Sequence, residues 1–212
     1  MLTELTLLGK SDATVAMVID TLVDLNFNSR VLKVVNNLNL PVEKEFSHPR
    51  FKIELIEQLS NRESWFILGV TKPNIKKAIV KEFNANELKW VELEHPTASV
   101  SSTTSFGKAF SIGPLSVISA HTKIGDFVTI NRGVTIGHHV VIENYVTINP
   151  GVNIAGNVII GEGTMVGIGA NVIDGVKIGK NSIIGAGSVV VRDIPDGVVA
   201  YGNPCKPMRE NG

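Results

Sequence analysis

The sequence predicts two domains of different class: a small α/β domain over residues 1–95 and an all-β parallel β-helix over residues 96–212. Two observations predict this division. Residues 1–95 alternate short apolar runs with amphipathic segments, whereas from residue 100 a large apolar residue recurs at every sixth position. Alternating strands and helices are typical of parallel sheets, and a fixed short period is typical of repeat folds.

The first domain contains the elements of a small parallel sheet flanked by helices. Its apolar runs predict strands over residues 5–9, 30–35, 65–70 and 89–93. Its amphipathic segments predict helices over residues 14–25, 53–59 and 74–83. In the first helix, Val15, Val18, Ile19 and Leu22 share one face, which is the pattern of a helix packed on a sheet.

The second domain is defined by a strict period of six. Sixteen consecutive positions at this spacing are all large and apolar: Val100, Phe106, Ile112, Ile118, Ile124, Ile130, Ile136, Ile142, Ile148, Ile154, Ile160, Val166, Val172, Ile178, Ile184 and Val190. In a chain that is 43% hydrophobic, chance would produce such a run with a probability of roughly one in a million. A β-sandwich would show a period of two with hairpin turns instead.

Each hexad predicts one short strand and one turn. The apolar residue points inward, and the fourth residue after it is small. The residue directly after the apolar one is glycine eight times, which we interpret as a need for backbone freedom in the turn. Three hexads close one triangular coil. Coils stack at the strand spacing of about 4.8 Å, and only the stack buries the apolar residues.

Composition excludes several classes of function. Twenty basic residues balance twenty acidic ones, so the chain has no general attraction to nucleic acid or anionic membranes. Cys205 is the only cysteine, so no internal disulfide forms. The chain shows neither a signal peptide nor an apolar run of membrane-spanning length, so we expect a cytoplasmic protein.

Four segments carry a resemblance to a known family: HPTASV (95–100), INRGVTIGHHVVI (130–142), INPGVNIAGNVIIGEG (148–163) and VAYGNPCKPMR (199–209). The repeat resembles the hexapeptide-repeat acyltransferases. The whole layout resembles their sialic acid O-acetyltransferase and bacterial nucleotide-amino-sugar N-acetyltransferase branch. The resemblance implies a Rossmann-like first domain, a left-handed β-helix, acetyl-CoA as co-substrate, and a homotrimer with active sites between subunits.

The resemblance places the catalytic base at His138. An imidazole suits this role because it titrates near working pH. His139 stands where the family usually has Asp or Glu, so the acidic partner of the base is expected elsewhere, either at Glu143 or in an adjacent subunit. His121 precedes His139 by one coil, so these two rings should stack about 4.8 Å apart.

The resemblance also places acetyl-CoA in a groove between two β-helices, with contacts at Thr147, Gly156, Ile168 and Ala186. Lys206 is expected near the CoA phosphates, and Cys205 is expected to pack in the cap that covers the last coil. For the acceptor, the resemblance places a nucleotide at Gly9, Lys10 and Ser11, after the first strand, and at Asn36. The first domain as a plain scaffold, or as the site of another acceptor, stays an open alternative.

The favoured function is transfer of an acetyl group to an amino group of a nucleotide-linked sugar in surface glycan synthesis. Three alternatives remain. The acceptor group could be a sugar hydroxyl. The three clustered imidazoles could hold zinc in a hydratase of the carbonic anhydrase type, although their spacing does not match that family and no metal is expected. The chain could also be a non-catalytic assembly protein.

Overall fold

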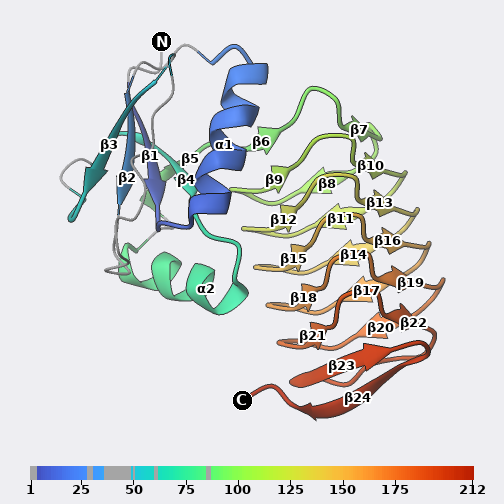
Figure 1. Ribbon diagram of the computed structural model, residues 1–212. Helices are drawn as coiled ribbons and strands as arrows, with labels where there is room; N and C mark the ends of the chain where they lie inside the picture. Colours follow the sequence, from blue (N-terminus) through green and yellow to red (C-terminus); the bar gives the residue numbers. More distant parts are fainter. Residues whose placement is uncertain (1–3, 28–30, 36–48, 50, 60–61, 85–86) are drawn as a thin grey trace. The chain divides into compact units, whose positions relative to one another are not determined.

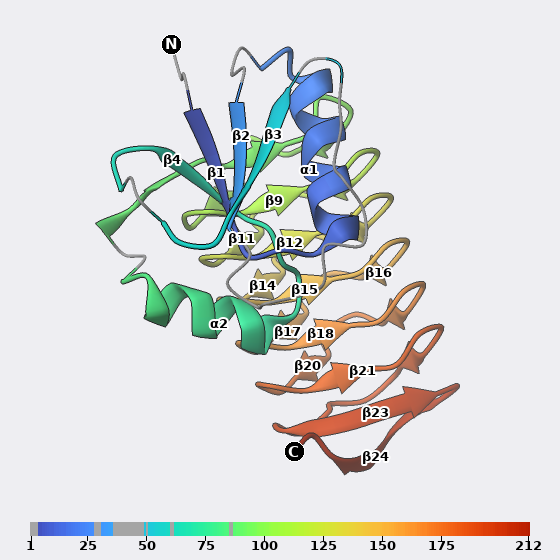
Figure 2. The ribbon, with the colours of Figure 1, turned by 60° about the vertical axis from the view of Figure 1, so that its left-hand side comes forward.

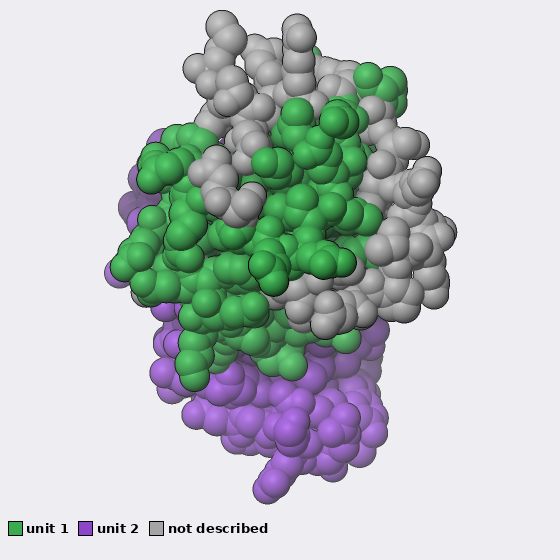
Figure 3. Space-filling model, turned by 90° about the vertical axis from the view of Figure 1, so that its left-hand side faces the viewer, with its two compact units in different colours: residues 1–92 green, residues 93–212 purple. Residues whose placement is uncertain are grey.

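The computed structural model describes residues 4–27, 31–35, 49, 51–59, 62–84 and 87–212. The chain divides into two compact units, residues 1–92 and residues 93–212, which Figure 3 shows in green and purple. Among the described helices, none has the length and apolar character needed to span a membrane.

The first unit contains one five-stranded sheet in which every strand pair is parallel. The strands are β1 (Glu4–Leu8), β2 (Val31–Val35), β3 (Lys52–Ile56), β4 (Trp65–Leu68) and β5 (Lys89–Trp90), and the helices are α1 (Asp12–Asp24) and α2 (Pro73–Glu82). The strand order is β3-β2-β1-β4-β5, so β1 lies in the middle (Figure 1). Its residues Leu5, Leu7 and Leu8 are fully buried.

Two of the expected elements in this unit are wrong. The helix expected over residues 53–59 is strand β3, which pairs with β2 from Val31↔Lys52 to Val35↔Ile56. The alternation in Lys-Ile-Glu-Leu is a period of two, which favours a strand. The strand expected over 89–93 is two elements, because β5 pairs with β4 whereas Leu93 begins a strand of the second unit.

The second unit is a left-handed parallel β-helix with three sheets (Figures 1 and 2). The first sheet contains β6 (Leu93–Glu94), β9 (Ser111–Ile112), β12 (Thr129–Ile130), β15 (Thr147–Ile148), β18 (Met165–Val166), β21 (Ile183–Ile184), β23 (Val198–Gly202) and β24 (Cys205–Glu210). The second contains β7 (Ser99–Val100), β10 (Val117–Ile118), β13 (Thr135–Ile136), β16 (Asn153–Ile154), β19 (Asn171–Val172) and β22 (Val189–Val190). The third contains β8 (Ser105–Phe106), β11 (Lys123–Ile124), β14 (Val141–Ile142), β17 (Ile159–Ile160) and β20 (Lys177–Ile178).

The predicted coil of three hexads is confirmed by strand register. Thr129 pairs with Thr147, and Thr147 pairs with Met165, each in parallel. The apolar residues of the sixfold repeat are buried from Ile112 to Val190, while Val100 and Phe106 are partly buried at the start of the stack. The small residues at the fourth position after them are also buried, so both inward positions fill the column as expected.

The glycines that follow the apolar positions have a different role from the one expected. None of these eight residues has a positive φ. Instead, a Cβ on Gly137 would lie 2.6 Å from the carbonyl carbon of Ala155, in the backbone of the next coil. The left-handed position lies two residues further on, where Gly133 has φ +64° and His139 has φ +58°. Glycine directly after the apolar position therefore allows close stacking of coils rather than an unusual backbone turn.

The C-terminal end of the column is closed by a β-hairpin. Strand β23 pairs in parallel with β21 and antiparallel with β24. Cys205 is buried against the column core, and burial raises the pKa of its thiol. The expectation that Cys205 packs, rather than acting as a nucleophile, is consistent with a thiol kept neutral.

Candidate active site

The candidate site is built on the corner between β13 and β14, which holds His138 and His139. Both side chains are exposed, and their rings are nearly perpendicular, at 83° with centroids 5.2 Å apart. Nδ1 of His138 lies 3.1 Å from Nδ1 of His139, within hydrogen-bond distance. The structure therefore brings the two predicted catalytic residues into direct contact.

This contact couples the tautomers of the two rings. Two nitrogen atoms at hydrogen-bond distance share one hydrogen, so one Nδ1 donates and the other accepts. When His138 is the donor, its Nε2 carries no hydrogen and can accept a proton, which is the form a general base requires. In that tautomer His139 accepts the hydrogen bond through its own Nδ1, and it supplies no negative charge.

A third imidazole extends the cluster along the column. The ring centroids of His121 and His139 are 4.9 Å apart with 44° between the planes, which confirms the predicted stacking one coil apart. Both residues adopt the left-handed conformation, with φ of +60° and +58°. In the part of the chain that the structure describes, no three His, Cys, Asp or Glu side chains, these imidazoles included, are arranged to hold a metal ion.

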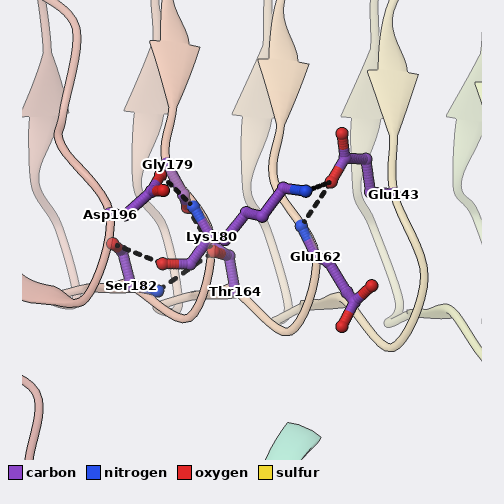
Figure 4. Close-up of polar contacts among 7 residues, drawn as sticks. All are labelled: Glu143, Glu162, Thr164, Gly179, Lys180, Ser182 and Asp196. Carbon is purple, nitrogen blue, oxygen red and sulfur yellow. Dashed lines mark hydrogen bonds and ion pairs between the residues drawn. The ribbon is translucent and has the colours of Figure 1, made fainter.

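Glu143 does not face His138 within this chain. It lies on the next corner, after β14, where its Oε2 accepts a hydrogen bond from the Glu162 backbone N–H at 2.9 Å and lies 3.6 Å from Lys180 Nζ (Figure 4). Lys180 in turn donates its backbone N–H to Asp196 at 2.8 Å. These contacts between coils hold the Glu143 carboxylate at a different corner, so within one chain it is not the acidic partner of His138.

Gly156 lies directly above His138 on the same corner, one coil further along. A Cβ on Gly156 would lie 2.7 Å from Cε1 and 2.9 Å from Nε2 of His138. The Asn157 backbone N–H donates to the His138 carbonyl at 2.9 Å, which fixes the separation of the two coils. The lack of a side chain at Gly156 therefore makes room for the imidazole against the backbone.

Sequence reasoning missed Asp174, which occupies this corner one coil beyond Gly156. Its Oδ1 accepts a hydrogen bond from Asn157 Nδ2 at 3.1 Å. The signal was present in the spacing, because Asp174 follows His138 by two complete coils.

The residues expected to contact acetyl-CoA lie on two different corners. Ile168 and Ala186 are exposed on the corner that precedes the strands of the second sheet, whereas Gly156 lies on the corner that follows them. Between these corners, Thr135 donates to Asn153 at 2.7 Å and Asn153 donates to Asn171 at 3.1 Å, forming an exposed polar ladder. A fourth expected contact, Thr147, is fully buried, which leaves its side chain no surface for a ligand.

The loop after β1 contains the residues expected to bind a nucleotide. Gly9 has φ +88°, and a Cβ on Gly69 would collide with the Gly9 carbonyl oxygen. Ser11 is the N-cap of α1 and makes no side-chain capping hydrogen bond. Lys10 is buried, with 2% of its surface exposed. Asn36 lies outside the described residues.

Part of the second unit matches a known family model. Residues 121–156 and 157–192 match the family described as bacterial transferase hexapeptide (six repeats). This match covers the corner with the imidazole pair and confirms the resemblance seen in the sequence. No curated protein is significantly similar to the chain in sequence.

Solved structures match nearly the whole length of the chain. The acetyltransferase domain of PglB from Neisseria gonorrhoeae, in complex with acetyl coenzyme A, has a TM-score of 0.85 and 26% identity, covering 98% of this chain and 100% of that one. PerB from Caulobacter crescentus, in complex with CoA and GDP-perosamine, has a TM-score of 0.83 and 25% identity, covering 98% of each chain. A variant of perosamine N-acetyltransferase from the same organism, with the same two ligands, has a TM-score of 0.84 and 24% identity, covering 99% of each chain.

Proposed function

We propose that this protein is an acetyl-CoA-dependent acetyltransferase that acts on an amino group of a nucleotide-linked sugar used for surface glycan synthesis. The observation that carries the proposal is the exposed His138, whose Nδ1 lies 3.1 Å from His139 Nδ1; with His138 as the donor of this hydrogen bond, its Nε2 can act as a base. Similar structures with bound acetyl coenzyme A, or with CoA and GDP-perosamine, support the same two substrates here.

The imidazole performs two proton transfers in this reaction. Nε2 of His138 takes a proton from the acceptor nitrogen as that nitrogen forms a bond to the thioester carbonyl carbon. The C–S bond then breaks, and the proton passes from the imidazole to the departing thiolate. The products are the sugar acetamide and CoA, and His138 returns to its starting form.

We propose that acetyl-CoA lies between two copies of the β-helix in a homotrimer. The corner of His138 and the corner of Ile168 and Ala186 lie on either side of the second sheet. If each site uses one corner from each of two subunits, both sets of residues contact one ligand. Gly156 is itself buried, so its proposed contribution is the space that it leaves beside His138. Thr147 is not part of this proposed contact set, because its side chain is buried.

We further propose that residues 1–92 form a Rossmann-like domain that binds the nucleotide of the acceptor. In the order β3-β2-β1-β4-β5, β2 and β3 lie on one side of β1, and β4 and β5 lie on the other side. The chain thus changes direction across the sheet at β1, and ligands of open parallel sheets bind at such a switch point. The Gly9 loop ends β1 at this place and leads into the N-terminus of α1, whose backbone N–H groups favour a phosphate. Since acetyl-CoA and nucleotide sugars are its proposed substrates, we expect the protein to act in the cytoplasm.

The proposal is tested by incubating the purified protein with acetyl-CoA and a panel of nucleotide-linked amino sugars. Release of the CoA thiol is followed with a colorimetric thiol reagent, and the product is identified by mass spectrometry. We expect thiol release that depends on the acceptor and a product heavier by one acetyl group that resists mild alkali, as an amide does. An alkali-labile product would show transfer to a hydroxyl, and no acceptor-dependent release together with no acetyl-CoA binding would contradict the proposal.

The Gly9 loop provides a separate prediction. In Gly69→Ala, the new methyl group collides with the Gly9 carbonyl oxygen and displaces the loop. We expect the KM for the nucleotide sugar to rise by about tenfold, or about 1.4 kcal/mol in binding, while the KM for acetyl-CoA is unchanged. Gly197→Ala is the control, because a Cβ there meets nothing within 4 Å and the strain from its φ of +67° falls on the turn before β23. Equal KM values for the acceptor in both variants would show that this loop does not bind it.

A further inference from the structure

The corner that carries His138 brings a carboxylate close to the imidazole across two coils. Positions one coil apart in the sequence stack on one another, so His138, Gly156 and Asp174 follow in a row along the column. In most such rows the middle side chain separates the outer two. Here the middle residue is glycine, so position 156 places no side chain between the imidazole and the carboxylate.

The geometry around Gly156 shows that the two groups converge. The position of a Cβ on Gly156 lies 2.9 Å from His138 Nε2 and 2.9 Å from Asp174 Oδ1. The two atoms are therefore separated by at most twice that distance. Both side chains border the space that any other residue at position 156 would fill.

Asn157 holds the carboxylate in this place. Its Nδ2 donates to Asp174 Oδ1 at 3.1 Å, and its backbone N–H donates to the His138 carbonyl at 2.9 Å. One residue thus links the coil of the imidazole to that of the carboxylate. The remaining Asp174 oxygen and the other lone pairs of Oδ1 stay available to a positive charge nearby.

The proton transfer at His138 creates such a charge. Two further imidazoles lie in the same cluster: His139, whose Nδ1 contacts Nδ1 of His138, and His121, which stacks on His139. Neither offers a negative charge to an imidazolium. A carboxylate at the observed range stabilises the protonated ring by Coulomb attraction.

We propose that Asp174 is the acidic positioning residue of this site, which acts on His138 across the gap left by Gly156. The proposal rests on the function proposed above, in which His138 is the general base. It assigns to a side chain two coils away the negative charge that the neighbouring His139 cannot supply. Asp174 stabilises the imidazolium that forms during transfer and does not itself contact the acetyl group.

The test is Asp174→Asn, assayed for acetyl transfer with the full-length protein. Asparagine keeps the shape and the oxygen that accepts from Asn157, but it removes the charge. We expect kcat to fall by about tenfold, with the KM values for acetyl-CoA and acceptor unchanged. The matched control is Asp193→Asn, which removes a carboxylate bonded to the Lys177 backbone N–H, and we expect it to keep wild-type kcat.

A rescue experiment separates charge from structure. In the variant Asp174→Asn with His139→Asp, a carboxylate returns to the neighbour of His138, and we expect kcat to recover at least severalfold relative to Asp174→Asn alone. Wild-type kcat in Asp174→Asn would overturn the inference. So would a raised acceptor KM with unchanged kcat, or a double variant no faster than Asp174→Asn while His139→Asp alone is active. If the wild-type protein transfers no acetyl group at all, the proposed function fails instead.

Discussion

Replacing His138 with alanine is expected to lower kcat for acetyl transfer by about 10²–10⁴-fold, which is the range that a positioned general base contributes. The acceptor nitrogen must lose its proton as it attacks, and His138 Nε2 is the proposed acceptor of that proton. Acetyl-CoA binding is expected to be retained, because the variant removes a base and not the groove. Steady-state kinetics and isothermal titration calorimetry measure the two effects separately.

The matched control is His121→Asn. His121 is exposed, adopts φ +60° and stacks on His139, and asparagine tolerates this backbone conformation well. We expect the kcat of His121→Asn to stay within about threefold of the wild type, since the His121 ring stacks on His139 and not on His138. If His138→Ala also stays within this range, His138 is not the general base and the proposed mechanism is contradicted.

The largest expected effect on stability comes from Gly137→Ala. Its methyl group would lie 2.6 Å from Ala155 C and 2.6 Å from Gly156 N, both of them backbone atoms of the next coil. The coils must separate locally, which strains the hydrogen bond from Gly137 N–H to the Ile154 carbonyl. We expect a loss of about 2–4 kcal/mol in the free energy of unfolding, or a fall in Tm of roughly 5–15 °C.

Gly133→Ala is the control within the same coil. Gly133 has φ +64°, but a Cβ there meets nothing within 4 Å, so the cost is limited to about 1–2 kcal/mol of left-handed strain. Thermal unfolding of both variants at one protein concentration compares them. A larger loss for Gly133→Ala than for Gly137→Ala would show that backbone freedom, rather than close stacking, explains the glycines of the repeat.

The column could be predicted from the sequence because its periodicity is a direct consequence of its geometry. Ile130, Ile136 and Ile142 repeat at every sixth position, and each occupies the interior as expected. The first unit was harder, because a short apolar run fits either a helix or a strand. Residues 52–56 pair with β2, and such pairing between distant segments leaves only a weak local signal.

The site could be predicted only where a motif or the coil length places it. The coil length of three hexads located His121 against His139 and Gly156 above His138. The hydrogen bond between the Nδ1 atoms of His138 and His139 depends on the side-chain rotamers, which the spacing of residues in the sequence does not determine. The burial of Thr147 and Lys10 depends on the residues that pack around them, and a match to a sequence motif gives no information about that packing.

A crystal structure of the protein with CoA and a nucleotide-linked amino sugar tests the central claim most directly. The account predicts that the CoA sulfur and the sugar nitrogen meet beside His138 Nε2, with the nitrogen within hydrogen-bond distance, and with the pantetheine arm running between two subunits past the His138 corner of one of them. CoA bound far from this corner, or a sugar nitrogen out of reach of every His138 imidazole, would contradict it.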